Sequence, residues 1–446
     1  MKRNKGEKVI GKIVIIGANQ GALTAAELLG KQGYTVVLYE MRKKNDVSYP
    51  WHDYMAPATF ARIGMPVPPE SIAKPKDKDW TFIPPDKKTS LSMHVPKDRR
   101  DVSVLRRPFD DWLYERAKDF AEIHYETAVK SAVCENGKVC GVELADGTKV
   151  SADLVIDCGG ANSCVRENLP KEFGIEGKLD TRCTFQVKRT FFKRDNDAPA
   201  PEKSHNLFMR HLGEKGITWC ADYPQDGVVD VLVGRIDELT DEAYNRALND
   251  VKTMFPIVSD EVFCGGKLTV IPLRHAASLM VADGYVLLGD SAFMTIPLMG
   301  SGMASSMLGA KILSEILDGK DDFSKENLYR YQVKYMQEIG GKNSGIDVLK
   351  NWMIDIDANA LSFLMNNKII GEKEFSSAGS GNGVQLSFGD ILQKLIAGIA
   401  HLPMLFNLIG ATTKMKKQMA IGKAIPPEWD ENAFLRWKQE YEKNFT

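Results

Sequence analysis

The sequence predicts an α/β chain, α+β overall, in which a nucleotide-binding unit is interrupted by an antiparallel sheet and followed by a helical region. Three observations support this fold class. A strand, turn, helix and second strand fill residues 12–40, buried strands return at 154–157 and 284–290, and the residues between 181 and 270 read mostly as strands. A chain of 446 residues can bury a large core and hold two or three structural units.

The first unit starts with the apolar, β-branched residues Ile13 to Ile16 and turns at Gly17. A helical period follows, and a second strand from Tyr34 to Tyr39 ends at Glu40, whose carboxylate can accept hydrogen bonds from an adenosine ribose. This pattern predicts a Rossmann-like βαβ unit with a diphosphate at the amides that open the helix. The alternative is an ordinary βαβ element without a nucleotide.

The glycine fingerprint of this unit departs from the usual pattern at one position. Asn19 stands where a second glycine normally lets the backbone approach the diphosphate. Asparagine adopts left-handed backbone angles more readily than most residues, and its side chain could instead contact a phosphate. The residues expected to bind the nucleotide here are Gly17, Asn19, Gly21, Ala22 and Glu40.

Composition narrows the function classes. A net charge of −1 gives no electrostatic case for nucleic acid, and seven cysteines without C-x-x-C spacing suggest neither a disulfide framework nor a metal site. The basic N-terminus leads straight into a strand, so no signal peptide is expected, and no apolar run reaches eighteen residues. These features predict a cytoplasmic protein.

The remaining elements follow in order. Residues 45–69 read as an irregular, functional loop, residues 80–95 as short strands, and Pro108 lies near the first turn of a helix that follows Arg106. Strands at 128–134, 138–144 and 148–151, joined by Asn-Gly and Asp-Gly turns, predict a β-meander. Helices are expected at 241–254 and 303–317. We therefore expect a discontinuous nucleotide-binding domain (1–75, 99–170 and 275–320), a substrate-binding sheet domain (76–98 and 171–274) and a helical region (321–446).

Three separated motifs carry a family resemblance. They are the N-terminal fingerprint, DLVIDCGGANSCVR and GYVLLGDSAFMTIPLMGSGM, in the order found in flavoproteins with the p-hydroxybenzoate hydroxylase fold. The third motif most resembles geranylgeranyl reductases and archaeal digeranylgeranylglycerophospholipid reductases. The similarity continues through IDVLKNWMIDIDANALSFLMNNKII and ILQKLIAGIAHLPMLFNLIGATTKMKKQM, and thus covers nearly the whole chain. Gly159-Gly160 stands where the hydroxylases carry Asp-Gly.

The resemblance implies an FAD cofactor. Asp290 can accept a hydrogen bond from a ribityl hydroxyl, and a helix beginning near Ser301 would point its positive end at the flavin N1/O2 edge. Arg106 occupies the place of a flavin-contacting arginine; the alternative is a solvated charge ahead of a helix. The further expected cofactor residues are Gly289, Gly300 and Gly302.

On the substrate side, Pro50-Trp51-His52-Asp53 matches the Pro-Cys-Gly-Asp of related reductases but lacks the thiol. An indole is far too weak an acid to donate the proton that such a reduction requires, so His52 is the first candidate donor and Tyr223 the second. The bulk of Trp51 should also make the substrate pocket shorter than in the related reductases. The alternative is that His52 only solvates a mobile loop.

The family's aromatic strand aligns with residues 219–224. Trp219, Ala221 and Tyr223 share one face of it and could line an apolar pocket, or simply pack in a core, while Cys220 points the other way as a small core residue.

The segment from Asp390 to Lys417 has an amphipathic pattern. One apolar helical face is expected to run to Leu402 and break at Pro403, with three lysines following. Such a helix can lie on the cytoplasmic face of a membrane or cap a core. The apolar face comprises Leu392, Leu395, Ile399 and Leu402, and the lysines are Lys414, Lys416 and Lys417.

These features together predict an FAD-dependent oxidoreductase that reduces carbon–carbon double bonds of an isoprenoid-like prenyl lipid by hydride transfer from reduced flavin N5. The alternatives are an FAD-dependent monooxygenase acting on an aromatic or alkene, and a flavin electron carrier. The chain has no second nucleotide fingerprint, so the electron donor is left open between NAD(P)H and a reduced electron-transfer protein.

Overall fold

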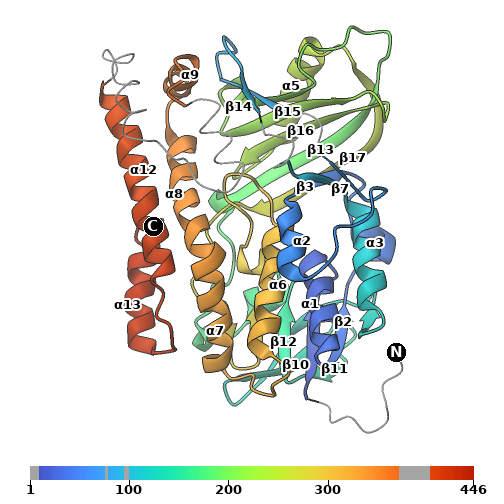
Figure 1. Cartoon of the computed structure of the whole chain (residues 1–446), viewed down its shortest axis with the longest axis vertical. Coiled ribbons are helices and arrows are strands. Elements are labelled where there is room, and N and C mark those ends of the chain that lie inside the picture. Colours follow the sequence, from blue (N-terminus) through green and yellow to red (C-terminus); the bar gives the residue numbers. More distant parts are fainter. Residues whose placement is uncertain (1–9, 76–78, 95–99, 371–401, 446) are drawn as a thin grey trace.

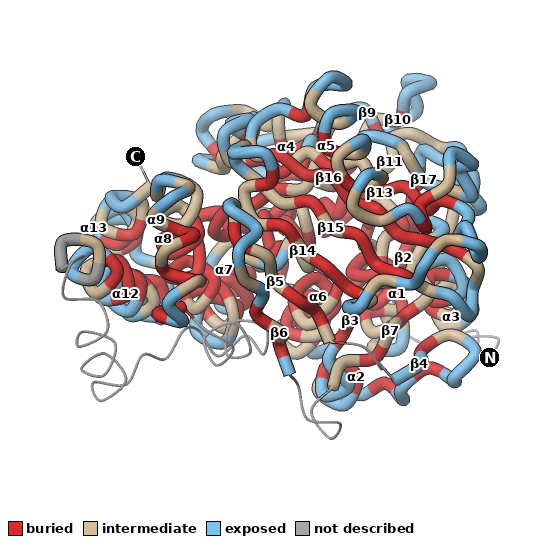
Figure 2. The backbone as a smooth tube through the Cα atoms, turned by 90° about the horizontal axis from the view of Figure 1, so that it is seen from above, coloured by how far each residue is buried: buried red, intermediate tan, exposed pale blue. Residues whose placement is uncertain are grey.

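The computed structural model of the chain describes residues 10–75, 79–94, 100–370 and 402–445. Two sheets lie end to end along its long axis, and the C-terminal helices α8, α12 and α13 run alongside them on one side (Figure 1). The central strands of both sheets are largely buried (Figure 2), whereas the edge strands β17 (Val258–Pro272) and β8 (Ala121–His124) are not. The mixed α/β class expected from the sequence is confirmed.

The first sheet contains six strands and carries the N-terminal βαβ unit. Its pairs are parallel except for the β18–β19 edge, and the apolar residues of β1 and β12 are buried because layers cover both faces. The order across this sheet is β18 (Val281–Ala282), β19 (Tyr285–Leu287), β12 (Leu154–Asp157), β1 (Lys12–Ile16), β2 (Thr35–Tyr39) and β8 (Ala121–His124).

Helix α1 (Gln20–Lys31) packs between α3 (Arg106–Ala117) and α6 (Met303–Leu317) over this sheet (Figure 1). The expected helix at 303–317 is confirmed. The expected meander is also confirmed, as β9 (Val129–Glu135), β10 (Lys138–Leu144) and β11 (Lys149–Ser151). Between β12 and the second sheet lies the short helix α4 (Cys164–Asn168).

The second sheet contains seven strands, and all of its pairs are antiparallel except β14–β5. The expected helix α5 (Asp241–Met254) packs on it. Its order is β17 (Val258–Pro272), β13 (Thr184–Arg194), β16 (Val228–Ile236), β15 (Gly216–Tyr223), β14 (His205–Met209), β5 (Trp80–Ile83) and β6 (Leu91–Met93).

The expectation that residues 45–69 are irregular is wrong. This stretch contains strand β3 (His52–Met55) and helix α2 (Pro57–Ile63), and β3 pairs with β7 (Val102–Leu105), which also pairs with β4 (Ala73–Pro75). The partner of β3 is about fifty residues away, so local periodicity does not reveal the pairing. The consequence is that Trp51 and His52 are held at the start of a strand.

The C-terminal region is helical where it is described. Pro403 lies in the first turn of α12, where a missing N–H costs little, and the helix expected to end at it precedes the described residues. Residues 392–399 of the expected amphipathic face lie outside the described part. None of the described helices is long and apolar enough to cross a membrane. The helices are α7 (Lys325–Tyr335), a π-helical turn (Met336–Gly340), α8 (Gly341–Asp355), α9 (Ala358–Asn366), α12 (Leu402–Lys423) and α13 (Glu431–Glu442).

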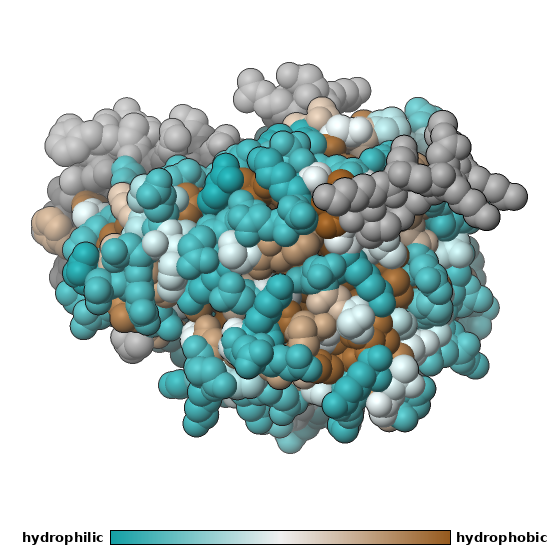
Figure 3. All heavy atoms as spheres, turned by 90° about the horizontal axis from the view of Figure 1, so that it is seen from below, coloured by the Kyte–Doolittle hydropathy of each residue, from teal (hydrophilic) through white to brown (hydrophobic). Residues whose placement is uncertain are grey.

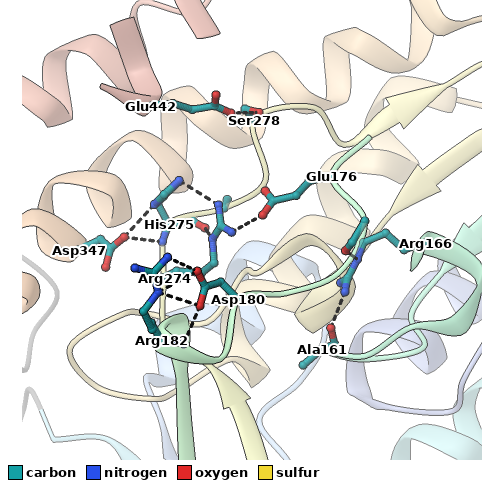
Figure 4. A network of polar contacts seen from close by, with 12 residues as sticks. Ala161, Arg166, Glu176, Asp180, Arg182, Arg274, His275, Ser278, Asp347 and Glu442 are labelled. Carbon is teal, nitrogen blue, oxygen red and sulfur yellow. Dashed lines mark hydrogen bonds and ion pairs between the residues drawn. The ribbon is translucent and has the colours of Figure 1, made fainter. Parts of the chain in front are cut away.

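A buried polar network joins these helices to the chain between the two sheets (Figure 4). His275 Nδ1 lies 2.8 Å from the Asp347 carboxylate of α8, and Arg274 pairs with Glu176. Ser278 donates a hydrogen bond of 2.7 Å to Glu442 of α13. Helices α8 and α13 are thus joined to the nucleotide-binding unit by ion pairs and hydrogen bonds as well as by apolar packing. On the lower face, hydrophilic side chains surround a smaller hydrophobic area (Figure 3).

Candidate active site

The turn between β1 and α1 is shaped to admit a diphosphate. Gly17 has φ +90°, and a Cβ there would lie 2.7 Å from the carbonyl oxygen of Cys158, so only glycine fits. Asn19 has extended backbone angles, so its tolerance of the left-handed conformation is not used. Its Oδ1 caps Ala22 N at 3.1 Å and its Nδ2 donates to Cys158 O at 2.8 Å, so the side chain holds the turn together. Gly21 lets α1 approach Ser306 of α6.

Glu40 follows β2 at the carboxyl edge of the sheet and is buried. Its carboxylate accepts hydrogen bonds from Ala18 N at 3.0 Å and from Arg42 N and Nε, both at 2.9 Å. Burial alone would raise the pKa of Glu40, but the Arg42 contacts and the backbone donors outweigh it and hold that pKa below its usual value. A ribose here would share the carboxylate with Arg42, a residue that the sequence analysis did not identify.

Asp290 lies in a single 3₁₀ turn, Gly289–Ala292, immediately after β19. Its Oδ1 accepts a hydrogen bond of 2.9 Å from Thr295 Oγ1, and a Cβ at Gly302 would lie 3.1 Å from the same oxygen. Burial raises the pKa of Asp290, and Thr295 and Arg106 oppose that rise. Gly302 is the N-cap of α6, which begins at Met303, and a Cβ on Gly300 would meet open space.

Arg106 begins α3, and its side chain is only 16% exposed, so the alternative of a solvated charge is wrong. Its Nη1 donates to Asp53 Oδ2 at 2.8 Å, and its guanidinium lies 5.3 Å from the Tyr49 ring centroid. Its Nε is buried and has no hydrogen-bond partner within the described residues. A buried donor without a partner is costly, and a flavin carbonyl or ring nitrogen would satisfy it.

These features fit an FAD molecule. A glycine turn at a helix N-terminus suits the diphosphate, a carboxylate at the end of β2 suits the ribose, and a second carboxylate after β19 suits the ribityl chain. The unsatisfied Arg106 Nε and the N-terminus of α6 supply positive charge toward the ring system.

The two candidate proton donors, His52 and Tyr223, lie together. His52 Nε2 is 2.8 Å from Tyr223 Oη, and Tyr54 Oη is 3.1 Å from the same hydroxyl. Burial, with the Arg189 cation second, lowers the pKa of His52, and burial raises the pKa of Tyr54 to about 12 and that of Tyr223 well above 10. His52 is therefore the group of the three that changes charge nearest to neutral pH.

An aromatic and apolar cluster borders this hydrogen-bonded group. Trp219, Ala221 and Tyr223 lie on one side of β15, as the alternation predicts, in a cluster with Trp80 of β5 and Met93 of β6. Cys220 faces the other way and is 1% exposed, which confirms its expected place in a core. Trp51 stacks on Tyr49 with ring centroids 4.3 Å apart.

Sequence reasoning missed three charged residues behind His52. Arg189 of β13 forms a bidentate ion pair with Asp230 of β16, and its Nη1 donates to Asp53 at 3.1 Å. A signal was present, because Asp230 stands within the apolar run Val228 to Val233, where a lone carboxylate must find a cation.

A model of the family described as FAD binding domain matches residues 11–320. The chain is 24% identical to the digeranylgeranylglycerophospholipid reductase of Sulfolobus acidocaldarius over 427 residues, 91% of each sequence. Among solved structures, a geranylgeranyl bacteriochlorophyll reductase-like protein from Thermoplasma acidophilum gives a TM-score of 0.71 at 15% identity, covering 90% of this chain and 99% of that one.

A second solved structure, the p-nitrophenol 4-monooxygenase of Pseudomonas putida, gives a TM-score of 0.58 at 18% identity and covers 85% of this chain and all of the other. The resemblance that the three motifs carry is thus confirmed, together with the flavin cofactor. The likeness to the solved structures concerns the fold.

Proposed function

Because this chain belongs to the FAD binding domain family and is an FAD-dependent oxidoreductase, we propose that it reduces a carbon–carbon double bond of a hydrophobic, isoprenoid-like lipid. The observation that carries this proposal is the His52–Tyr223 hydrogen bond of 2.8 Å beside an aromatic, apolar cluster. Such a site offers a proton donor to an apolar substrate that has no acidic group of its own. The similarity to archaeal prenyl-lipid reductases along 91% of the chain supports the choice of substrate class.

We assign FAD binding to two groups of residues. The turn and helix after β1, with Glu40, hold the diphosphate and ribose, and the segment after β19, with Arg106, faces the ribityl chain and ring. When bound and reduced, FAD supplies the hydride at its N5. The assigned residues are Gly17, Asn19, Gly21, Ala22, Glu40, Arg106, Gly289, Asp290, Gly300 and Gly302.

On the substrate side, His52 donates the proton that completes alkene reduction, and Tyr223 orients the imidazole through its hydroxyl. Trp219 and Trp51 bound the apolar space next to this pair. Since Trp51 replaces a much smaller side chain of the related reductases, we expect a shorter prenyl chain to fit.

The proposal is tested by anaerobic turnover. Enzyme reduced with dithionite is mixed with geranylgeranyl diphosphate and, separately, with a digeranylgeranylglycerol lipid, and the products are analysed by mass spectrometry. A gain of two hydrogens per reduced bond supports the reductase. The fold shared with p-nitrophenol 4-monooxygenase makes oxygen insertion the second candidate. A product that gains oxygen in air, with no anaerobic gain of two hydrogens, would favour that candidate and contradict the reductase.

The proposal also covers the domain boundaries, the electron donor and a membrane contact. We propose that the flavin-binding domain comprises residues 1–75, 99–170 and 275–320, the substrate domain 76–98 and 171–274, and the helical region the rest. We also propose NAD(P)H or a reduced electron-transfer protein as donor, and contact of the C-terminal region with the cytoplasmic face of a membrane. Reduction of the bound flavin by NADPH under argon, followed at about 450 nm, separates the two donor classes.

A further inference from the structure

Four side chains form a line of alternating charge from the flavin side of the site into the second sheet. Asp53 accepts from Arg106 Nη1 at 2.8 Å and from Arg189 Nη1 at 3.1 Å, and Arg189 Nη2 lies 2.7 Å from Asp230 Oδ2. From Asp53 onward burial increases, because Asp53 is 33% exposed, Arg189 7% and Asp230 0%. At its buried end, the cation and carboxylate are therefore screened little by water.

Arg189 also holds the backbone of the segment that carries the proposed proton donor. Its Nη1 donates to the carbonyl oxygen of His52 at 3.0 Å. Three aromatic rings surround its guanidinium, with centroids 5.2 to 5.4 Å away, those of Trp51, Phe191 and Trp219. A guanidinium with paired donors and covered faces has one stable position, so it can fix what it contacts.

We propose that Asp53 and Arg189 are positioning residues, which hold His52 against Tyr223 and set the charge that the imidazole carries. This inference rests on the proposed function, in which His52 is the proton donor. The experiment that tests the inference does not require turnover. Neither residue touches the reacting atoms in this scheme; both act through His52.

The two residues should act on the imidazole in opposite directions. The Arg189 cation disfavours a proton on His52, whereas the carboxylates of Asp53, Asp230 and Asp226 favour it. Among the described residues, the hydroxyls of Tyr223 and Tyr54 also lie beside it and are neutral at working pH. Removing the cation must therefore raise the pKa of His52, and removing the Asp53 charge must lower it.

The experiment measures the pKa of His52 by NMR in the oxidised, FAD-bound protein without substrate, from the imidazole Cε1–H signal of ¹³C-histidine-labelled samples. The chain has seven histidines, so the His52 signal is assigned as the one missing from His52→Gln. We expect a rise of about one unit in Arg189→Gln and a fall of about half a unit in Asp53→Asn. Arg189→Lys, which keeps the charge, should stay within about 0.3 units of the wild type.

A matched control lies on the same strand. Arg194 of β13 pairs with Asp222 of β15, at 2.9 Å and with side chains 8% and 5% exposed, so Arg194→Gln breaks a similarly buried pair elsewhere. Shifts of opposite sign, with no shift in Arg194→Gln, support the proposal. Shifts of the same sign in Arg189→Gln and Asp53→Asn, or none in either, would overturn it, because loosening of the structure moves both variants alike.

Near-UV circular dichroism shows which variants are folded. If Arg189→Gln does not fold, Asp53→Asn and Arg189→Lys decide alone: a fall in the first with none in the second supports the positioning role, and any other pair of results rejects it. The anaerobic product assay is independent of these titrations, so failure of the proposed reaction would be seen separately.

Discussion

His52 Nε2 lies 2.8 Å from Tyr223 Oη, although 171 positions separate the two residues in the chain. Strand β3 begins at His52 and β15 ends at Tyr223, and the contact forms because these two strand ends lie together. Two residues that separately qualified as proton donors thus form one unit, in which the hydroxyl with the very high pKa fixes the imidazole with the lowered one.

The first prediction concerns the loss of the imidazole. We expect His52→Ala to slow alkene reduction at least tenfold, about 1.4 kcal/mol of transition-state stabilisation, while reduction of the flavin by its donor is unchanged. Rapid mixing of the two half-reactions measures both rates. Tyr223→Phe keeps the ring and removes only the hydroxyl, so its effect should be smaller. An unaltered oxidative half-reaction in His52→Ala would exclude His52 and favour Tyr223 or ordered water as the donor.

The second prediction concerns pH. Burial and the Arg189 cation lower the pKa of His52, so the imidazolium, the form that donates the proton, becomes scarcer as pH rises above that pKa. The rate of alkene reduction by pre-reduced enzyme should therefore decline between about pH 5.5 and about pH 8. His52→Gln should remove this dependence. A rate that increases with pH would mean that a base, rather than an acid, limits the step.

The third prediction concerns the cofactor. Glu40→Ala combined with Asp290→Ala removes both carboxylates assigned to FAD, and the purified protein should lose its yellow colour. Heat release and chromatography identify the flavin and its stoichiometry. Glu202→Ala with Asp260→Ala is the control, since those side chains are 90% and 99% exposed, and it should retain FAD. FMN in the wild type, or full FAD in the double variant, would contradict the assignment.

The fourth prediction concerns chain length. Trp51 stacks on Tyr49 and covers the Arg189 guanidinium at 5.4 Å, so a smaller residue would open space beside them. We expect Trp51→Ala to lower KM for a longer prenyl substrate relative to a shorter one, and Trp51→Phe to lie between it and the wild type. Steady-state kinetics with two chain lengths measure this. An unchanged preference in both variants would remove Trp51 from the pocket.

The fifth prediction concerns stability. Burial is the main reason why the pKa of His275 is lowered, with Arg274 adding to the effect and Asp347 opposing it. The unfolded chain then binds the proton more readily, so stability is full above the ordinary histidine pKa of 6.5 and falls as pH drops below it. Asp347, whose pKa is also lowered, loses its contribution only at much lower pH, below 3.8.

Urea unfolding at about pH 7.5 and about pH 5.5 tests this. His275→Gln should cost about 2 kcal/mol at the higher pH, because the Asp347 carboxylate loses its hydrogen bond to the buried imidazole, and should flatten the dependence on pH. His94→Gln, at a histidine that is 73% exposed, should change stability by less than about 0.5 kcal/mol. Equal pH dependence in the wild type and His275→Gln would contradict the prediction.

Much of the fold could be predicted because it depends on hydrophobic patterns and turns within short stretches of the sequence. Strand β1, the turn at Gly17 and helix α1 are each recognisable from a few neighbouring residues, and the same holds for β12, the meander and α6. Neither the conformation of Asn19 nor strand β3 was predicted, since each depends on contacts with distant segments, those of Cys158 and of Val102–Leu105.

The sequence by itself determined the fold class through its periodicity, and its motifs, through the family they resemble, pointed to the flavin cofactor and to the residues that qualify as proton donors. Only the tertiary structure decided that His52 meets Tyr223, that Arg106 is paired and buried, and that Asp53, Arg189 and Asp230 stand behind the imidazole. The physical reason is that a charge or proton donor takes its properties from its neighbours in space. Here those neighbours come from β3, β13, β15 and β16, whose register is set by sheet pairing rather than by local sequence.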